Sequence, residues 1–427
     1  MFKTLQNAWK IPELRKKLIF TMMILLIYRL GSVIPLPYVD TAILANYFDT
    51  TLSNTILGLF DAMSGSAFSR ATVLALGIQP YINASIIIQL LTIAIPALER
   101  MAKDEGEEGK KKLERITRYT TVGLGLVLGF GYYTMLKNYV SQGYAIITDT
   151  GFLPGLVIVL AFTAGASFVM WLGEQITEHG IGNGISMILF AGIISRIPTL
   201  VSALVAMKWW EIILVLIGMA ALVVFIVFIN DAERRIPIQY AKRVVGRKVY
   251  GGQNTNMPIK VAMTGVMPII FASALVSIPG TIGSFMQVDQ AAHPFWYAFF
   301  RTFNYTSPLY VVIYLLLILA FNYFYVAIQY NPVEIANNLR RNNGSIPGFR
   351  PGKPTSDFLT RTLNKITLMG AIFLAAVAVL PIILGNLTGM SIQLGGTSLL
   401  IVVGVALDTT RSLDSFMTMR NHKGFLG

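Results

Sequence analysis

Long apolar stretches recur along the whole chain and are separated by shorter polar segments. Because the hydrocarbon core of a membrane is about 30 Å thick, a helix needs roughly 20 mostly apolar residues to cross it. The pattern therefore predicts an all-α, polytopic membrane protein with ten spans. We expect these spans at residues 18–34, 71–97, 119–139, 153–173, 182–204, 210–230, 261–286, 308–328, 366–385 and 394–410.

One amphipathic segment, from Asn54 to Arg70, does not follow the pattern of the spans. It is rich in small residues and is shorter than the roughly 20 residues that a crossing needs. It is either a surface helix outside the membrane or a re-entrant segment, at about 56–70, that enters a cavity lined by protein. The residues of the segment leave both interpretations open.

A nine-residue phrase occurs twice, in spans that the ten-span topology runs in opposite directions. The copies are Gly77–Ser85 and Gly265–Ser273, and both follow the pattern Gly, apolar, x, Pro, x, Ile, x, Ala, Ser. An inverted repeat of this kind places a functional site at the interface between the two halves. We expect one five-span half at 1–207 and a second at 208–427.

Charge is scarce and unevenly placed. Charged residues make up 13% of the chain, against about 25% in soluble domains. Most of the 34 lysines and arginines lie in segments that the ten-span topology places on one side of the membrane. Because such residues concentrate in cytoplasmic loops, we expect both termini in the cytoplasm.

Two long basic loops, at about 231–260 and 329–365, lie on this cytoplasmic side. Valine and tyrosine around the cations of the first loop predict a hairpin, whereas the second loop is rich in proline and glycine. The loops are either orientation signals only or docking surfaces. As docking surfaces they would bind RNA phosphates or an acidic protein surface.

Polar residues inside the spans are few, and two features stand out. Arg29 lies near the end of the first span, from which its side chain can reach the membrane surface. Ser85, Gln89 and Thr92 follow i, i+4, i+7 spacing and therefore share one face of the second span. This stripe either forms hydrogen bonds between packed helices or lines a cavity or seam.

The sequence lacks the residues on which several kinds of membrane enzyme and carrier depend. It has no cysteine, which excludes disulfides and thiolate chemistry. No span holds paired acidic residues or a histidine, which disfavours an ion-coupled carrier and an intramembrane serine protease. The chain also has no Walker A motif for ATP. We therefore expect no enzyme activity, no catalytic residue, no metal ligand and no cofactor.

Several motifs resemble those of the SecY family, in the same order along the whole chain. They are Gly77–Gln89 (GIQPYINASIIIQ), Gly180–Ile185 (GIGNGI), Tyr240–Arg243 (YAKR), Asn331–Pro332, Pro347–Gly352 (PGFRPG) and Gly395–Ile401 (GGTSLLI). The resemblance implies two inverted five-helix halves around an hourglass pore. It also implies a protein-conducting channel, which passes unfolded preproteins across the membrane and releases apolar segments laterally into it.

The resemblance assigns three parts of such a channel to residues of this chain. The pore ring, an apolar waist, would consist of Ile82, Ile86, Ile185, Leu189, Ile270 and Ile401. The plug, a short helix that seals the idle channel, would include Gly58, Leu59, Phe60, Asp61, Ala62, Met63, Ser64, Gly65, Ser66 and Ala67, with Asp61 keeping one face in water. The lateral gate, between spans two and three on one side and seven and eight on the other, would include Ile87, Ile278, Ser85, Gln89 and Thr92.

The basic loops are implied to dock the partner that supplies energy. The residues assigned to docking are Arg350, Arg243, Arg247, Lys248, Arg340 and Arg341. The implied partners are the SecA ATPase, a translating ribosome, the small subunits SecE and SecG, an unfolded preprotein with a signal sequence, and membrane lipid. No direct DNA binding is expected, and the implied location is the bacterial cytoplasmic membrane.

Two other functions compete with a passive channel. A small-solute secondary transporter shares inverted repeats and broken spans, but it needs a polar or charged site at the middle of the membrane. A membrane scaffold that only recruits soluble partners would explain the basic loops but not the duplicated spans. The apolar ring therefore favours the channel.

Overall fold

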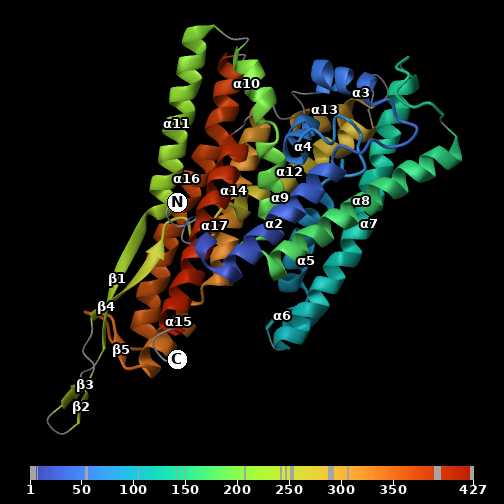
Figure 1. Cartoon of the computed structure of the whole chain (residues 1–427). Helices are drawn as coiled ribbons and strands as arrows, with labels where there is room; N and C mark the ends of the chain where they lie inside the picture. Colours follow the sequence, from blue (N-terminus) through green and yellow to red (C-terminus); the bar gives the residue numbers. More distant parts are fainter. Residues whose placement is uncertain are drawn as a thin grey trace.

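The computed structural model is a bundle of helices from which one β-hairpin projects (Figure 1). It describes residues 6, 8–52, 56–103, 105–141, 143–149, 151–205, 208–240, 243–245, 248–250, 254–286, 293–304, 307–388 and 396–423. A π-helical turn, η1, covers Phe48–Leu52. The α-helices are α2 (Pro12–Gly31), α3 (Thr41–Tyr47), α4 (Ile56–Ser64), α5 (Gln79–Ala94), α6 (Pro96–Lys103), α7 (Gly106–Ser141), α8 (Phe152–His179), α9 (Gly184–Ile194), α10 (Ile197–Val205), α11 (Trp209–Asp231), α12 (Met267–Met286), α13 (Pro294–Thr302), α14 (Pro308–Gln329), α15 (Pro332–Arg341), α16 (Lys353–Thr388) and α17 (Gly396–Lys423).

Each of the ten predicted spans coincides with a described helix or pair of helices, namely α2, α5, α7, α8, α9 with α10, α11, α12, α14, α16 and α17. By length and composition alone, four described stretches are suited to crossing a membrane: Phe152–His179, Met267–Met286, Pro308–Arg341 and Lys353–Leu380. The bent pair of α5 and α6, with an angle of 107°, is a fifth. Helix α2 falls outside this group because its apolar run is flanked by Arg15, Lys16 and Lys17 and interrupted by Arg29.

Two spans differ from their predicted form. The helix of the second span begins only at Gln79, because residues 71–78 form turns. It ends before Ile95, which is extended (φ −112°, ψ 112°), the conformation that a following proline, here Pro96, favours. The fifth span breaks into α9 and α10, with Ser195 and Arg196 between them.

The two copies of the repeated phrase adopt the same local structure. Gly77 and Gly265 both have positive φ, 53° and 60°, a conformation that glycine adopts without steric cost. In each copy a helix begins two residues after this glycine. The amides of Ile82 and Ile270 then each donate to the carbonyl four residues earlier, at 3.0 and 3.2 Å. The repeat in the sequence is therefore also a repeat in structure.

The hairpin predicted in the first basic loop is confirmed. Strand β1 (Glu233–Tyr240) pairs antiparallel with β4 (Asn254–Lys260). At the far end, β2 (Arg243–Val245) pairs with β3 (Lys248–Tyr250). Strand β5 (Gly344–Ser345), from the second basic loop, pairs with the other side of β1. Figure 1 shows the hairpin reaching beyond the helices, at the end of the molecule that also carries α15.

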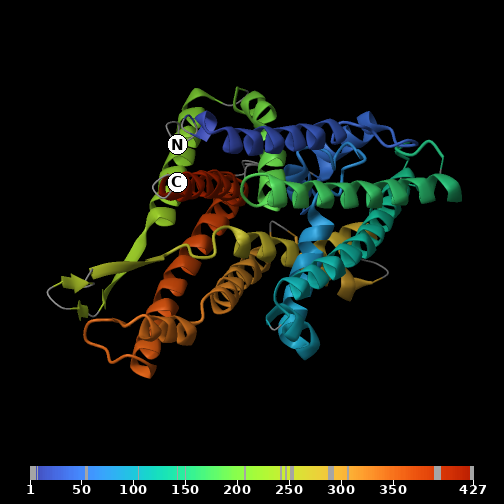
Figure 2. The same cartoon turned by 60° about the horizontal axis from the view of Figure 1, so that its bottom comes forward.

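The second basic loop is shorter than the predicted 329–365. Asn331 caps α15 by accepting hydrogen bonds from the amides of Val333 and Glu334. Because α16 begins at Lys353, the residues from there to 365 belong to a helix. Figure 2 shows α15, the connecting turn and the start of α16 on the same side of the bundle as the hairpin.

One large apolar core joins helices from both ends of the chain, from α2 to α17. A second, smaller cluster holds the base of the hairpin against α15 and α16. It contains Ile236, Ile238 and Ile259 of the hairpin, with Leu339 of α15 and Leu363 of α16. Because these side chains are buried, the hairpin projects from a fixed base.

Candidate functional site

The six residues predicted as an apolar ring come from four helices, α5, α9, α12 and α17, which meet in the large core. Five of them are at most 3% exposed and belong to one cluster: Ile82, Ile86, Leu189, Ile270 and Ile401. The sixth, Ile185, is half-buried and packs against the same cluster. Residues from opposite ends of the chain thus converge in one aliphatic region.

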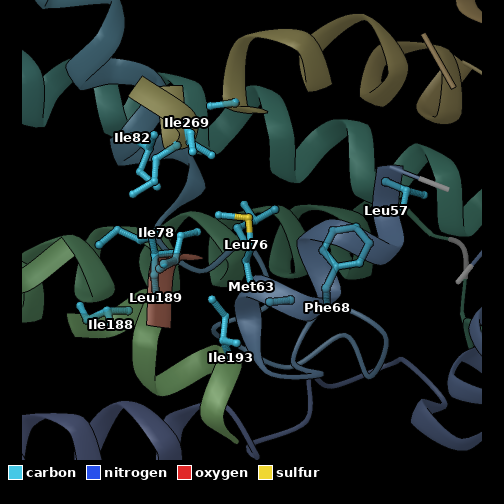
Figure 3. Packing of buried hydrophobic residues seen from close by; sticks show 14 of the residues in the cluster. Leu57, Met63, Phe68, Leu76, Ile78, Ile82, Ile188, Leu189, Ile193 and Ile269 are labelled. Atoms are coloured by element: carbon cyan, nitrogen blue, oxygen red, sulfur yellow. The ribbon is translucent and has the colours of Figure 1, made fainter. Parts of the chain in front are cut away.

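The segment of residues 56–70, called here the plug segment, packs into this same core. Its helix α4 ends at Ser64, and turns follow to residue 70. Leu57, Met63 and Phe68 are buried in the cluster that contains the ring residues. Figure 3 shows Met63 close to Leu76 and to Ile193 of α9, with Phe68 and Leu57 to one side. This burial favours the re-entrant interpretation, because a surface helix would leave one side in water.

Three side chains of the surrounding helices donate hydrogen bonds to carbonyls of the plug segment. The pairs are Tyr28 with Ser64, Arg29 with Gly65, and Tyr132 with Phe68, at 3.4, 3.4 and 2.7 Å. The guanidinium of Arg29, near the end of the first span, thus contacts this segment. Turns expose carbonyl groups that a helix would satisfy internally, and these donors supply the missing partners.

Asp61 is buried, so the prediction that it keeps one face of the plug in water is wrong. Only 4% of the residue is exposed. Its Oδ1 accepts a hydrogen bond of 2.8 Å from the amide of Ser69, and its Oδ2 lies 3.7 Å from Nη1 of Arg196. A carboxylate removed from water needs such partners, because an unpaired buried charge is costly. Arg196, between α9 and α10, supplies the opposite charge.

Two glycines allow the plug segment to approach α9 closely. A Cβ atom at Gly192 would overlap the carbonyl of Met63. A Cβ at Gly65 would overlap the side chains of Ser195 and Arg29, and Gly65 also has a φ of +69°. The contact between the plug segment and α9 therefore depends on glycine on both sides.

An apolar cavity of about 180 Å³ lies between the plug segment and helices α5, α7, α9 and α12. Both apolar residues predicted for the gate, Ile87 of α5 and Ile278 of α12, line it. Phe60 and Met63 of α4 form another part of its wall, and so does the ring residue Leu189. The cavity thus brings residues predicted for the plug, the ring and the gate to one place.

The polar stripe of α5 contributes a hydrogen bond to another helix. Gln89 donates through Nε2 to Ser85 Oγ at 3.1 Å, and it accepts through Oε1 from the hydroxyl of Tyr325 in α14 at 2.7 Å. Thr92 instead donates to the carbonyl of Gln89 in its own helix, at 2.6 Å. The stripe had two interpretations, and for Gln89 the structure shows the first of them, a hydrogen bond between helices.

Three of the predicted docking cations are exposed near the base of the hairpin. Arg340 and Arg341 end α15, and Arg350 lies in the turn before α16. Gly348 and Gly352, on either side of Arg350, have φ angles of 86° and 104°, which favour glycine. The turn therefore holds Arg350 between two residues that shape the backbone.

The other three docking cations were predicted at the tip of the hairpin. Arg243 belongs to β2 and Lys248 to β3, so their backbones are at its far end. Arg247 lies outside the described residues.

The chain has known relatives along its whole length. A family profile described as SecY matches residues 72–410. The chain belongs to the SecY family. The protein translocase subunit SecY of Bacillus licheniformis is 42% identical over 440 residues, and that of Bacillus subtilis is 41% identical over 443 residues. Both alignments cover all of this chain and all of the relative.

Solved structures share the fold of this SecY-family chain. One, described as the structure of a protein conducting channel, matches with a TM-score of 0.63 at 20% identity over 96% of each chain. Sec61 in the canine ribosome–channel complex from the endoplasmic reticulum matches with a TM-score of 0.62 at 19% identity, also over 96% of each chain. The fold is that of an all-α membrane protein whose two inverted five-helix halves surround an hourglass pore.

The sequence did not single out the side chains that hold the plug segment and α5 in place. Tyr28, Tyr132, Arg196 and Tyr325 belong to none of the motifs that resemble the SecY family. Each is a polar group within or beside an apolar run, and that isolation is the one signal that could have found them. This signal does not identify the residue that each polar group contacts.

Proposed function

We propose that this chain is a protein-conducting channel, which passes unfolded preproteins across a membrane and releases apolar segments laterally into it. The observation that carries the proposal is the packing of the plug segment into the cluster that contains the apolar ring. Helices from both halves of the chain supply this ring. The described arrangement corresponds to a closed channel.

An aliphatic ring suits a passage for unfolded chains. Ile82, Ile270 and their neighbours cannot form hydrogen bonds that would hold a passing segment. A narrow apolar constriction also sheds water and so blocks ions. In the idle channel the plug segment adds a second seal, which must leave before a polypeptide can pass.

We assign the lateral gate to the seam that α5 forms with α12 and α14. Ile87 and Ile278 line the cavity at this seam. The hydrogen bond between Gln89 and Tyr325 joins α5 to α14 when the seam is closed. Separation of these helices would join the cavity to lipid, so that a sufficiently apolar segment partitions into the membrane.

A secondary transporter is the weaker alternative. Its binding site would need polar or charged groups near the middle of the membrane. The six ring residues are all aliphatic, and Asp61 and Arg196 pair with each other within the plug contact. A scaffold that only recruits partners would have no use for a segment buried in an apolar ring.

Energy comes from a partner, because the chain has no ATP-binding motif. Arg340, Arg341 and Arg350 present exposed cations at the hairpin end, where the SecA ATPase or a ribosome would dock. The canine Sec61 relative belongs to a ribosome–channel complex. SecE and SecG would complete the assembly in the bacterial cytoplasmic membrane, with both termini of this chain in the cytoplasm. The chain itself catalyses no reaction.

Crosslinking to a stalled, translocating polypeptide tests the proposal. Because the chain contains no cysteine, single cysteines at Ile82, Ile185, Ile270 and Ile401 can be introduced without background. We expect all four positions to capture the passing polypeptide. Cysteines at Ile217 of α11 and Leu316 of α14, which are 65% and 56% exposed on the flanks of helices, serve as controls and should not react. If none of the four ring positions crosslinks to the polypeptide, and the purified protein takes up a small solute, the result would support the transporter instead.

A further inference from the structure

Helix α13 carries an aromatic surface that has no part in the channel described above. It contains no buried residue. Phe295, Trp296 and Phe299 are 73%, 52% and 39% exposed. Figure 1 shows α13 at the same end of the molecule as α4, opposite the hairpin. A group of exposed aromatic side chains of this kind marks an interaction surface.

A hollow of about 530 Å³ lies between α13 and the end of α12. It is lined by Pro279, Ile282, Met286, His293, Trp296, Phe299 and Phe300. The two helices meet where Phe300 of α13 lies against Gly283 of α12. A Cβ atom added at Gly283 would lie 2.7 Å from the Phe300 side chain. Ile282 and Met286 are 44% and 63% exposed, so the hollow is continuous with the apolar flank of α12.

We propose that α13 lies in the plane of the lipid–water interface and that the hollow holds an acyl chain of a phospholipid. With nine residues, the helix is too short to cross a membrane. Its rings suit the interface, where aromatic side chains concentrate. Tyr297 and Arg301, four residues apart, share the side of the helix away from Phe295 and Phe299. From there the exposed Arg301 can reach the phosphate of a headgroup.

The lining of the hollow selects an acyl chain over a peptide. A peptide needs a partner for each backbone N–H and C=O that it buries, whereas an acyl chain needs none. Among the lining residues only His293 and Trp296 carry a strong hydrogen-bonding group, and the sulfur of Met286 is a weak acceptor. The adjoining flank of α12 is the surface of a span, which faces hydrocarbon in a membrane protein. The inference requires the membrane location of α12 but not its role in the gate.

Fluorescence quenching tests this assignment in the full chain, purified with the subunits that accompany it and reconstituted in phosphatidylcholine vesicles. Trp296 is kept as the sole tryptophan by the substitutions Trp9→Phe, Trp171→Phe, Trp209→Phe and Trp210→Phe. Bromine atoms are placed on the acyl chains either close to the glycerol or close to the methyl end. We expect the bromines close to the glycerol to quench Trp296 about twofold more strongly, because the indole lies at interface depth.

A matched control moves the indole by two positions, through Trp296→Phe with Ala298→Trp. Ala298 is exposed and lies about 200° around the helix from Trp296, so aqueous iodide should quench the indole there more strongly than Trp296. Equal quenching of the two by iodide would place α13 in water. If neither iodide nor brominated lipid quenches Trp296, protein covers its indole. If bromines at the methyl end quench it more strongly than those close to the glycerol, the indole lies in the hydrocarbon core and not at the interface. Each of these three results overturns the proposal.

Discussion

The hydroxyl of Tyr325 in α14 lies 2.7 Å from Oε1 of Gln89 in α5, although 236 positions separate the two residues. Gln89 is itself oriented by its hydrogen bond to Ser85. The contact crosses the seam that we assign to the lateral gate. It joins the two sides of the closed gate by a hydrogen bond.

Replacement of this hydroxyl should make the gate easier to open. Tyr325→Phe keeps the ring and removes one neutral hydrogen bond, which contributes about 1 kcal/mol, or roughly fivefold in the ratio of open to closed gates. We expect improved export of a reporter protein whose signal sequence has been weakened. Tyr323→Phe is the matched control, because the Tyr323 hydroxyl is exposed and its bond to Asn364 is 3.4 Å long. Equal export by the two variants would show that the Tyr325 hydroxyl does not help to close the gate.

The ion pair of Asp61 and Arg196 should hold the plug segment in place. Arg196→Gln removes the positive charge that lies 3.7 Å from Oδ2 of the buried Asp61. Loss of a fully buried pair costs at least about 3 kcal/mol. Since the Arg196 side chain is 14% exposed, we expect about 2 kcal/mol here, or roughly 30-fold in the fraction of unsealed channels. Ion conductance in planar bilayers measures this fraction.

A double variant distinguishes the ion pair from a general loss of packing. Asp61→Asn together with Arg196→Gln removes both charges, so it should conduct less than Arg196→Gln alone. Arg235→Gln is a control that breaks an exposed pair with Glu233, and such pairs contribute little. Asp61→Asn is also measured alone. If the free-energy change for unsealing in the double variant equals the sum of the changes in the two single variants, the two charges do not act as a pair.

Gly192 should be sensitive to even one added methyl group. In Gly192→Ala the new Cβ would overlap the carbonyl of Met63, and overpacking of this kind costs about 1–3 kcal/mol. We expect the plug segment to shift and the idle channel to conduct ions, without loss of the folded protein from the membrane. Gly218→Ala in α11 is the control, because a Cβ there meets no atom within 4 Å. A tightly sealed Gly192→Ala channel would contradict the packing described here.

Arg350 should affect energy coupling without affecting the seal. Arg350→Glu reverses an exposed charge in the turn before α16. It should slow preprotein passage driven by SecA roughly tenfold, because charge complementarity sets how partners meet. Ion conductance of the idle channel should stay unchanged. Lys137→Glu reverses an exposed charge on α7 and should leave the rate of passage as it was. Equal rates for both variants would argue against docking at Arg350.

The local elements were predictable because nearby residues encode them. The helix starts at Gln79 and Met267 follow from a glycine that permits positive φ and from a proline that suits the first turn of a helix. The hairpin of β2 and β3 follows from the valines and the tyrosine that stand among its cations. The aliphatic character of the ring could likewise be read from the motifs, since it depends on residue type alone.

The sequence by itself therefore determined the spans, the repeat and the apolar nature of the ring. Only the tertiary structure decided that Asp61 is buried beside Arg196, that Arg29 contacts the plug segment, and that Gln89 meets Tyr325. The physical reason is that a polar side chain gains its energy from partners and from the water it loses. Both are set by segments far away along the chain, which no local pattern specifies.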